Sequence, residues 1–174
     1  MPVQKPGKSK QDYGTPIELI EAVTRRFGEL TTDLAAHDDG SNAKCARWIG
    51  ESKNSLEQDW LYEIGFGGIG WLNPPFADIN PWAEKCKLES RKGARIIMLT
   101  PASVGAEWFA RHVEDDNEGR GYATMIVPLR PRITFEGAKD PYPKDCCLTL
   151  WGFMKADPKG MFMPVIPYGS WRWK

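Results

Sequence analysis

Apolar residues at helical spacing predict the first helix of the chain, just after Thr15. The spaced apolar positions are Ile20, Val23 and Phe27. Thr15 is expected to be the N-cap, with Pro16 at the first helical position and Glu18 placed to complete a capping box. Gly28 can then take the left-handed position that follows many helix C-termini.

Short apolar and β-branched runs, bounded by glycine, proline and polar residues, predict strands. The predicted strands are residues 30–36, 69–72, 94–99, 122–129, 132–135 and 146–153. A second helix is expected from about Asp78 to the residue before Gly93, with Asn80-Pro81 as its cap and first position. A third, shorter helix is expected at 107–113.

The order of these elements predicts an α/β fold. Strands alternate with helices through the first two-thirds of the chain, which favours βαβ units and a mainly parallel sheet. The last third is rich in strands, so antiparallel edge strands are expected to close the sheet. Residues 43–60 are ambiguous, with a short helix expected near 45–49.

Length and composition predict a single domain. A chain of 174 residues, 41% of them hydrophobic, can bury a core. Residues 1–11 have almost no apolar side chains and are expected to form a flexible basic tail before a domain at 12–174. No apolar run is long enough to span a bilayer and no signal-peptide core is present, so a soluble, cytoplasmic protein is expected.

Charge and metal-ligating residues limit the classes of function. The 23 basic and 23 acidic residues give zero net charge, which weighs mildly against a nucleic-acid binder but allows a local basic face. His37 and His112 are isolated in the sequence, so no metal is expected. The cysteines form no CxxC pair and are interpreted as reduced, mostly buried thiols. They are Cys45, Cys86, Cys146 and Cys147.

The most informative motif is Asn73-Pro74-Pro75-Phe76, at the end of a predicted buried strand. Ligands of open α/β sheets bind beyond the carboxyl ends of strands. The two prolines have no N–H donor, so carbonyl oxygens can face a cleft without competing donors. The side-chain oxygen of Asn73 and the carbonyl of Pro74 could accept both hydrogens of an exocyclic amine and localise its lone pair on nitrogen. Phe76 could stack on a base taken out of the helix.

The same tetrapeptide also has a purely structural interpretation. Asn-Pro starts many turns, so the motif could be a strand exit before a helix, with Phe76 in the core. Asp78, just past the motif, is interpreted as a helix cap and not as a catalytic residue. The glycine-rich strand before the motif and the capped helix after it favour the catalytic interpretation.

The sequence resembles the phage and prophage DNA N6-adenine methyltransferases of the Dam type, from about Asp12 to Phe153. The resemblance rests on an ordered set of short motifs, of which only Asn73-Pro74-Pro75-Phe76 is specific by itself. The others are Tyr13-Gly14-Thr15-Pro16, Asp33-Leu34-Ala35-Ala36, Asn54-Ser55-Leu56, Asp59-Trp60, Pro81-Trp82, Met98-Leu99-Thr100-Pro101-Ala102, Trp108-Phe109 and Pro131-Arg132-Ile133-Thr134-Phe135.

The resemblance implies a Rossmann-like methyltransferase fold, S-adenosylmethionine as methyl donor and double-stranded DNA as substrate. It implies that residues 73–76 are catalytic, and that Tyr13, Thr15 and Pro16 lie near the donor's carboxylate. A helix N-terminus is physically suited to that carboxylate. Thr15 could instead be only an N-cap, or serve both purposes.

Further donor contacts are implied along the next two segments. Asp33 would pair with the donor's ammonium group, with Ala35 and Ala36 allowing close approach, although Asp33 could be only a turn residue at a strand end. Many methyltransferases have a glycine-rich turn where this chain has alanines. Either Asn54-Ser55 or Asp59 could accept a hydrogen bond from the donor's adenine amine.

Contacts with DNA are expected from Arg130, Arg132 and Lys144, although these could be ordinary solvated charges. No separate target-recognition domain fits in this length, so specificity is expected in the loops 37–53, 115–121 and 136–145. Two other functions remain open: methylation of another amine (cytosine N4, RNA guanine N2 or protein glutamine), and DNA binding without catalysis. The oligomeric state is not evident, with a monomer slightly favoured.

Overall fold

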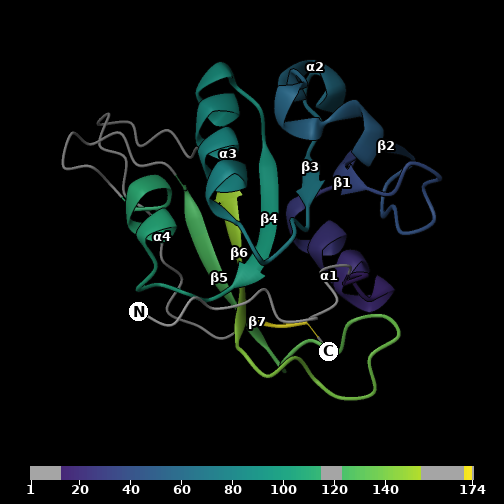
Figure 1. Cartoon of the computed structure of the whole chain (residues 1–174), viewed down its shortest axis with the longest axis vertical. Coiled ribbons are helices and arrows are strands. Elements are labelled where there is room, and N and C mark those ends of the chain that lie inside the picture. Colours follow the sequence, from purple (N-terminus) through teal and green to yellow (C-terminus); the bar gives the residue numbers. More distant parts are fainter. Residues whose placement is uncertain (1–12, 115–122, 154–170, 174) are drawn as a thin grey trace.

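The computed structural model describes residues 13–114, 123–153 and 171–173. The strands in these ranges are β1 (Thr32–Ala36), β2 (Arg47–Gly50), β3 (Gly70–Leu72), β4 (Ile96–Pro101), β5 (Met125–Arg130), β6 (Cys146–Trp151) and β7 (Trp171–Arg172). The helices are α1 (Ile17–Phe27), α2 (Trp60–Ile64), α3 (Asn80–Lys92) and α4 (Glu107–His112), with 3-10 turns at Glu51–Lys53 and Ser55–Glu57. Figure 1 shows their arrangement.

The strands form one sheet in the order β2-β1-β3-β4-β6-β5-β7. Neighbouring strands from β2 to β4 are parallel, and β6 runs antiparallel to both β4 and β5. The predicted mainly parallel α/β sheet is therefore confirmed. The expectation of antiparallel edge strands is wrong, because β6 lies inside the sheet and β7 adds to β5 in parallel. All six residues of β6 are buried, which is typical of an internal strand.

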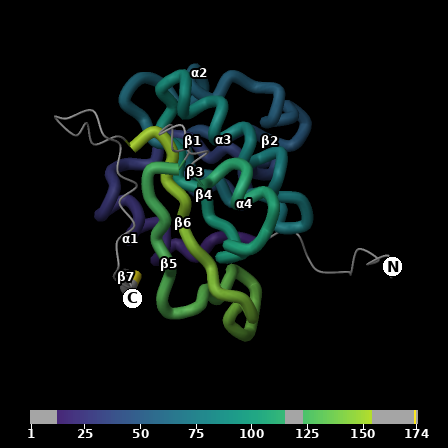
Figure 2. The backbone as a smooth tube through the Cα atoms, turned by 90° about the vertical axis from the view of Figure 1, so that its left-hand side faces the viewer, coloured from purple at the N-terminus to yellow at the C-terminus, as the bar shows by residue number. Residues whose placement is uncertain are grey.

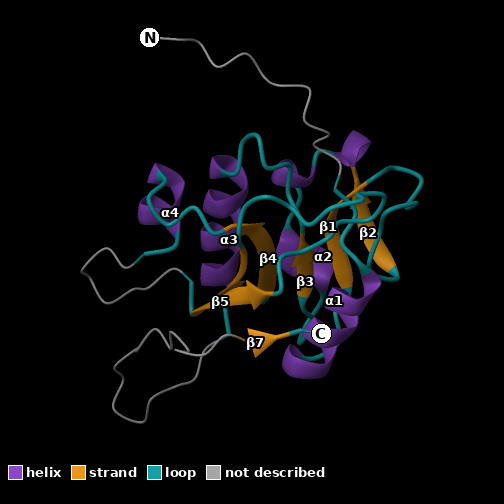
Figure 3. Ribbon diagram, turned by 90° about the horizontal axis from the view of Figure 1, so that it is seen from below, coloured by secondary structure: helices purple, strands orange, loops and turns teal. Residues whose placement is uncertain are grey.

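Helices cover both faces of the sheet, and each face has its own core. Alternate strand residues point to opposite faces, so Trp71 joins the core under α1 while Leu72 joins the core under α2, α3 and α4. Figure 3 shows α1 on one side of the strands and α3 and α4 on the other. The strands of such a sheet are buried on both faces, which explains their nearly continuous apolar sequences.

Helix α1 forms where the apolar spacing predicts it, but it begins later than expected. The residue preceding it is Pro16, in an extended conformation, and no side chain caps the helix. Thr15 is not the N-cap, and its Oγ1 is buried without a hydrogen-bond partner among the described residues. The predicted capping box is therefore wrong, because Thr15 faces the interior next to the sheet. Gly28 ends the helix with a positive φ of 111° but not in the left-handed helical region.

Helix α3 begins at Asn80 and ends at Lys92, close to the predicted bounds. The residue before it is Ile79, so neither Asp78 nor Asn80 is the cap as expected, and Pro81 occupies an early helical position. The side chain of Glu89 is buried on this helix between Lys85, at 2.9 Å, and Lys92, at 2.8 Å. These two lysines hold the pKa of Glu89 below its ordinary value although burial acts in the opposite direction.

Two short segments differ from their predicted structure. Residues 45–49 do not form a helix, because Arg47–Gly50 pairs with the open edge of β1, and pairing between strands overrides local preference. Residues 132–135 do not form a strand. Ile133 and Phe135 alternate into the core as strand residues would, but the carbonyl of Ile133 accepts a hydrogen bond from the N–H of Tyr142 in the same loop and not from a neighbouring strand. This segment belongs to the loop between β5 and β6 at the lower end of Figure 2.

The cysteines are unpaired thiols. Cys86, Cys146 and Cys147 are buried and Cys45 is partly buried, which confirms the interpretation of reduced, mostly buried thiols. Burial raises the pKa of Cys45 and of Cys146 to about 12. Thiols with such a pKa carry little thiolate at neutral pH and are poor nucleophiles.

The connection between β1 and β3 determines where a ligand can bind. From β1 the chain passes to β2 on one side, and it then returns to form β3 on the other side of β1. Such a reversal opens a crevice beyond the carboxyl ends of the two strands that flank it. Residues that follow β1 and β3 are therefore placed at the mouth of this crevice.

Gly152 at the end of β6 allows a close approach that any side chain would prevent. A Cβ there would lie 2.1 Å from the carbonyl oxygen of Ala94, and its φ is +74°. Gly67 has nearly the same φ, +77°, but open space around it. We expect Gly152→Ala to lower the free energy of unfolding by about 1–3 kcal/mol more than Gly67→Ala, because only the former adds a backbone clash. Urea unfolding of both variants tests this, and equal losses would contradict it.

Candidate functional site

A cavity of about 390 Å³ lies at the carboxyl ends of β1 and β3, where the topology opens a crevice. Nine residues predicted as site residues line it: Tyr13, Thr15, Asp33, Ala35, Ala36, Asn54, Ser55, Asn73 and Pro75. Seven others do not line it: Pro16, Asp59, Pro74, Phe76, Arg130, Arg132 and Lys144. The volume lies within the range of small-molecule sites.

Asp33 is a buried carboxylate at the cavity wall. Its Oδ1 accepts a hydrogen bond from the main-chain N–H of Ala35 at 3.1 Å, and its Oδ2 accepts one from the N–H of Lys44 at 2.9 Å. Burial raises the pKa of Asp33 above its ordinary value, and these two N–H groups oppose that rise. A cationic ligand beside Asp33 would stabilise the charged carboxylate.

Two further polar atoms at the cavity wall are buried without partners among the described residues. They are the Oγ1 of Thr15 and the Nε1 of Trp71. Both residues line the cavity and are almost fully buried. A buried hydrogen-bond donor without a partner lowers the stability of the folded protein. Where such a donor occurs in a natural protein, a ligand, a water molecule or a catalytic role often explains it.

Asn73 follows β3 directly and lies at the cavity wall. Its Nδ2 donates a hydrogen bond to the main-chain carbonyl of Tyr13 at 2.5 Å. That bond fixes the orientation of the amide and leaves its Oδ1 without a protein donor among the described residues. Pro75 also lines the cavity, whereas Pro74 is buried and is not part of the lining. The carbonyl of Pro74 accepts no main-chain hydrogen bond in the described ranges.

Four aromatic rings gather next to Asn73. Tyr13, Phe76, Phe135 and Tyr142 are in mutual contact, with ring centroids 5.0–5.9 Å apart for all six pairs. Tyr13 is the member that lines the cavity. The cluster, which we name the aromatic cluster, brings together segments before α1, after β3 and between β5 and β6.

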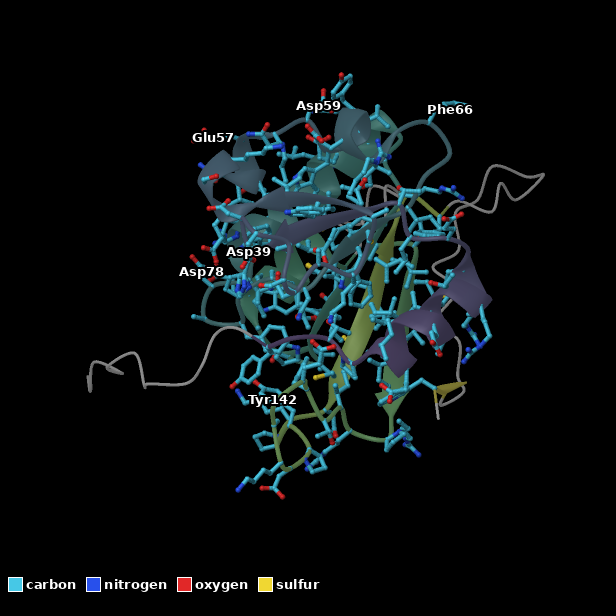
Figure 4. The ribbon with its side chains drawn as sticks, turned by 90° about the vertical axis from the view of Figure 1, so that its right-hand side faces the viewer. Asp39, Glu57, Asp59, Phe66, Asp78 and Tyr142 are labelled. Carbon is cyan, nitrogen blue, oxygen red and sulfur yellow. The ribbon has the colours of Figure 1, made fainter. Side chains whose placement is uncertain are left out.

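The loop at 131–145 docks onto the segment that precedes α1. The N–H of Glu136 donates to the carbonyl of Gly14 at 2.9 Å, and its carboxylate pairs with Lys44 at 2.7 Å. Tyr142 lies on this loop, at the lower end of the molecule in Figure 4. The predicted DNA residues are on or beside the same loop: Arg130 and Lys144 are exposed, and Arg132 pairs with Asp145 at 2.9 Å.

The residues predicted for the donor's adenine have different surroundings. Ser55 is buried, and its hydroxyl donates to the carbonyl of Leu34 at 2.5 Å while accepting from Trp60 Nε1 at 3.0 Å. Asp59 caps α2 by accepting from the N–H of Tyr62, away from the cavity and far from the Tyr142 end of the molecule in Figure 4. Asn54 is exposed at the cavity wall with a left-handed φ of 47°.

Several cavity residues were not predicted from the sequence. Glu51 directly follows β2, so its carboxylate lies at the same edge of the sheet as Asp33 and Asn73. An acidic residue after a strand is a detectable signal, but the ambiguous pattern at 43–60 concealed the strand. His37, considered from the sequence only as a metal ligand, also lines the cavity. Lys44 and Trp71 carry no local signal that would have assigned them, and Trp82 belongs to the Pro81-Trp82 motif but was not expected to be a site residue.

The described ranges contain no cluster of three or more His, Cys, Asp or Glu side chains that could hold a metal ion. None of the helices in these ranges has both the length and the apolar character needed to cross a membrane.

The parallel sheet, the cavity at its crossover and the proline pair beside it define an α/β protein with a small-molecule site. A family model identifies the class of protein: the model of the DNA N-6-adenine-methyltransferase (Dam) family matches residues 3–143. The chain belongs to this family and is an adenine-specific DNA methyltransferase, as the resemblance implied. No curated protein shows significant similarity to it. No finding favours the other amines or a non-catalytic relative.

Ser55 supports the cavity wall through two hydrogen bonds of its hydroxyl. We expect Ser55→Ala to lower the free energy of unfolding by about 1–3 kcal/mol, because buried partners lose a hydrogen bond. Urea unfolding tests this. Ser103→Ala is the matched control, since the Ser103 hydroxyl makes no hydrogen bond in the described residues. The idea fails if the two variants unfold at the same urea concentration.

Proposed function

We propose that the enzyme transfers the methyl group of S-adenosylmethionine to N6 of an adenine turned out of double-stranded DNA. We further propose that its fold is of the Rossmann-like methyltransferase type and that one domain carries both catalysis and specificity. The observation that carries this proposal is the single cavity at the β1–β3 crossover. Its wall holds a buried carboxylate, Asp33, and an amide oxygen free of protein donors, that of Asn73.

The residues of this cavity fit S-adenosylmethionine. Its amino-acid end carries a carboxylate and an ammonium group, and the wall offers the unpartnered hydroxyl of Thr15 and the carboxylate of Asp33. Ala35 and Ala36 have small side chains beside them, so a ligand can approach the end of β1. When bound, the donor supplies a methyl group on a positively charged sulfur atom.

The adenosine end of the donor would lie toward β2. Glu51 is exposed at the cavity wall and could accept hydrogen bonds from ribose hydroxyls, as acidic residues do after a strand in dinucleotide-binding folds. Asn54 is the best placed of the predicted adenine ligands, because the Ser55 hydroxyl is already bonded inside the protein and Asp59 caps α2.

The reaction requires the adenine amine to become a nucleophile. Its nitrogen lone pair is delocalised into the purine ring, and two acceptors that hold both hydrogens would localise it. Asn73 Oδ1 and the Pro74 carbonyl would be those acceptors, with Tyr13 fixing the Asn73 amide. The new N–C bond forms as the S–C bond breaks, and the amine proton is lost to water. Positioning of the two reacting atoms supplies much of the rate.

The aromatic cluster would receive the base. An amine within a duplex is not accessible to this cavity, so the nucleotide must be extruded. Phe76 packs against Tyr13, which lines the cavity, so an adenine that enters beside Asn73 meets these rings. Arg130, Arg132 and Lys144 on or beside the docked loop would contact phosphates or bases, since arginine and lysine dominate such contacts.

Asn73→Ala tests the catalytic assignment. We expect turnover to fall by about 10²–10³-fold, because one acceptor for the amine is lost, while donor affinity changes little. Nucleoside analysis of methylated DNA and calorimetry with the donor measure the two effects. Asp78→Ala is the control, because Asp78 is exposed just past the motif and outside the cavity, and this variant should remain active. Undiminished methylation by Asn73→Ala would overturn the assignment.

Donor affinity should depend on the ionisation of Asp33. Only the charged carboxylate pairs with an ammonium group, so affinity should fall as the pH is lowered toward the raised pKa of Asp33. Asp33→Asn should weaken binding about 10–100-fold at neutral pH, as expected for a lost charged hydrogen bond. Calorimetry with S-adenosylhomocysteine, which keeps the ammonium group, measures both.

Asp59→Asn is the control for this experiment, because Asp59 lies outside the cavity. The affinity of this variant for S-adenosylhomocysteine should match that of the wild type. His37 and Glu51 also line the cavity, and the pH profile of Asp33→Asn separates any contribution of theirs from that of Asp33. A wild-type profile identical in shape to that of Asp33→Asn would refute the role of Asp33.

A further inference from the structure

Trp71 carries a buried hydrogen-bond donor that the described part of the chain leaves unsatisfied. It lies on β3, is fully buried, and lines the cavity, yet its Nε1–H has no acceptor. Trp60 and Trp151 are equally buried, and their Nε1 atoms are bonded to Ser55 and Thr149. The unsatisfied donor is therefore particular to the tryptophan at the cavity and not a general property of the buried tryptophans.

The position of Trp71 relates it to Asp33. The two residues are paired in register on the neighbouring strands β1 and β3. Paired residues of adjacent strands point to the same face of a sheet and lie about 5 Å apart. The other unsatisfied polar atom at this cavity, Thr15 Oγ1, precedes the helix that covers the same face.

The three groups have complementary chemistry. Asp33 can only accept hydrogen bonds when ionised, and an indole N–H can only donate. A ligand that satisfies both must present a donor and an acceptor a few ångströms apart, and a cation beside Asp33 with an anion beside Trp71 makes the strongest such pair. An α-amino acid does so, because its ammonium and carboxylate groups share one carbon atom.

We propose that Trp71 binds the carboxylate of the methyl donor, together with Thr15, and so recognises the amino-acid end of that molecule. This inference rests on the proposed use of S-adenosylmethionine. Both hydrogen-bond donors belong to residues that line the cavity, and neither has a partner among the described residues. Trp71 then acts on donor affinity and on the position of the methyl group, and it does not contact the adenine that is methylated.

Truncated donors test the assignment. Trp71→Phe keeps the buried ring but removes the N–H. We expect its affinity for S-adenosylmethionine to fall about tenfold, as for one hydrogen bond to a charged group. Its affinity for decarboxylated S-adenosylmethionine, which keeps the ammonium group, should equal that of the wild type. Asp33→Asn should weaken the binding of both ligands.

Trp151→Phe is the matched control, because Trp151 is equally buried but bonded to Thr149 and absent from the cavity wall. It should bind both ligands as the wild type does. If Trp71→Phe weakens both ligands equally, or neither, the inference is wrong. If the wild type binds neither ligand, the proposed donor itself is wrong, so the two failures are distinguishable.

A measurement on the wild-type protein covers the case in which Trp71→Phe does not fold. The indole N–H signal of Trp71, assigned among the eight tryptophans by triple-resonance NMR, should move downfield with S-adenosylhomocysteine. It should not move with 5′-methylthioadenosine, which lacks the amino-acid end. A signal that responds equally to the two ligands would refute carboxylate binding by Trp71.

Discussion

The adjacency of β1 and β3 is the constraint on which the rest of the site depends. Because the chain leaves β1 in one direction and returns to β3 in the other, a crevice opens beyond the carboxyl ends of these two strands. Asp33 and Asn73, which are distant in sequence, therefore lie at one cavity. A carboxylate for the donor and an acceptor for the target amine must be close to each other if a methyl group is to pass between two molecules.

The short segment from Tyr13 to Thr15 connects the two halves of that cavity. The carbonyl of Tyr13 holds the Asn73 amide, its ring belongs to the aromatic cluster, and Gly14 accepts a hydrogen bond from the loop at 131–145. One segment thus touches the cavity, the Asn73 amide and the loop that carries the expected DNA contacts. Its position is fixed by tertiary contacts, because no helix or strand includes it.

The cavity collects groups that are unfavourable for folding. Asp33 is a buried carboxylate with a raised pKa, and the Thr15 and Trp71 donors have no partners among the described residues. The two cores on either side of the sheet are almost entirely apolar and offset this disadvantage. Such a concentration of unsatisfied polar groups in one cavity is typical of functional sites, where a ligand supplies the missing partners.

The sequence by itself determined the class of fold and the centre of the site. Apolar runs separated by helical patterns predicted the parallel sheet, and Asn73-Pro74-Pro75-Phe76 pointed to the strand end at which the cavity lies, because both depend on local residue order. Tertiary structure decided three other features. The strand at 47–50 formed because the edge of β1 was open, and β6 took an interior place between β4 and β5. Thr15 turned into the interior instead of capping α1. Only the tertiary structure brought three further residues to the cavity: Glu51, Lys44 and Trp71. The reason is that the residues adjacent in sequence do not determine how close a side chain lies to another strand.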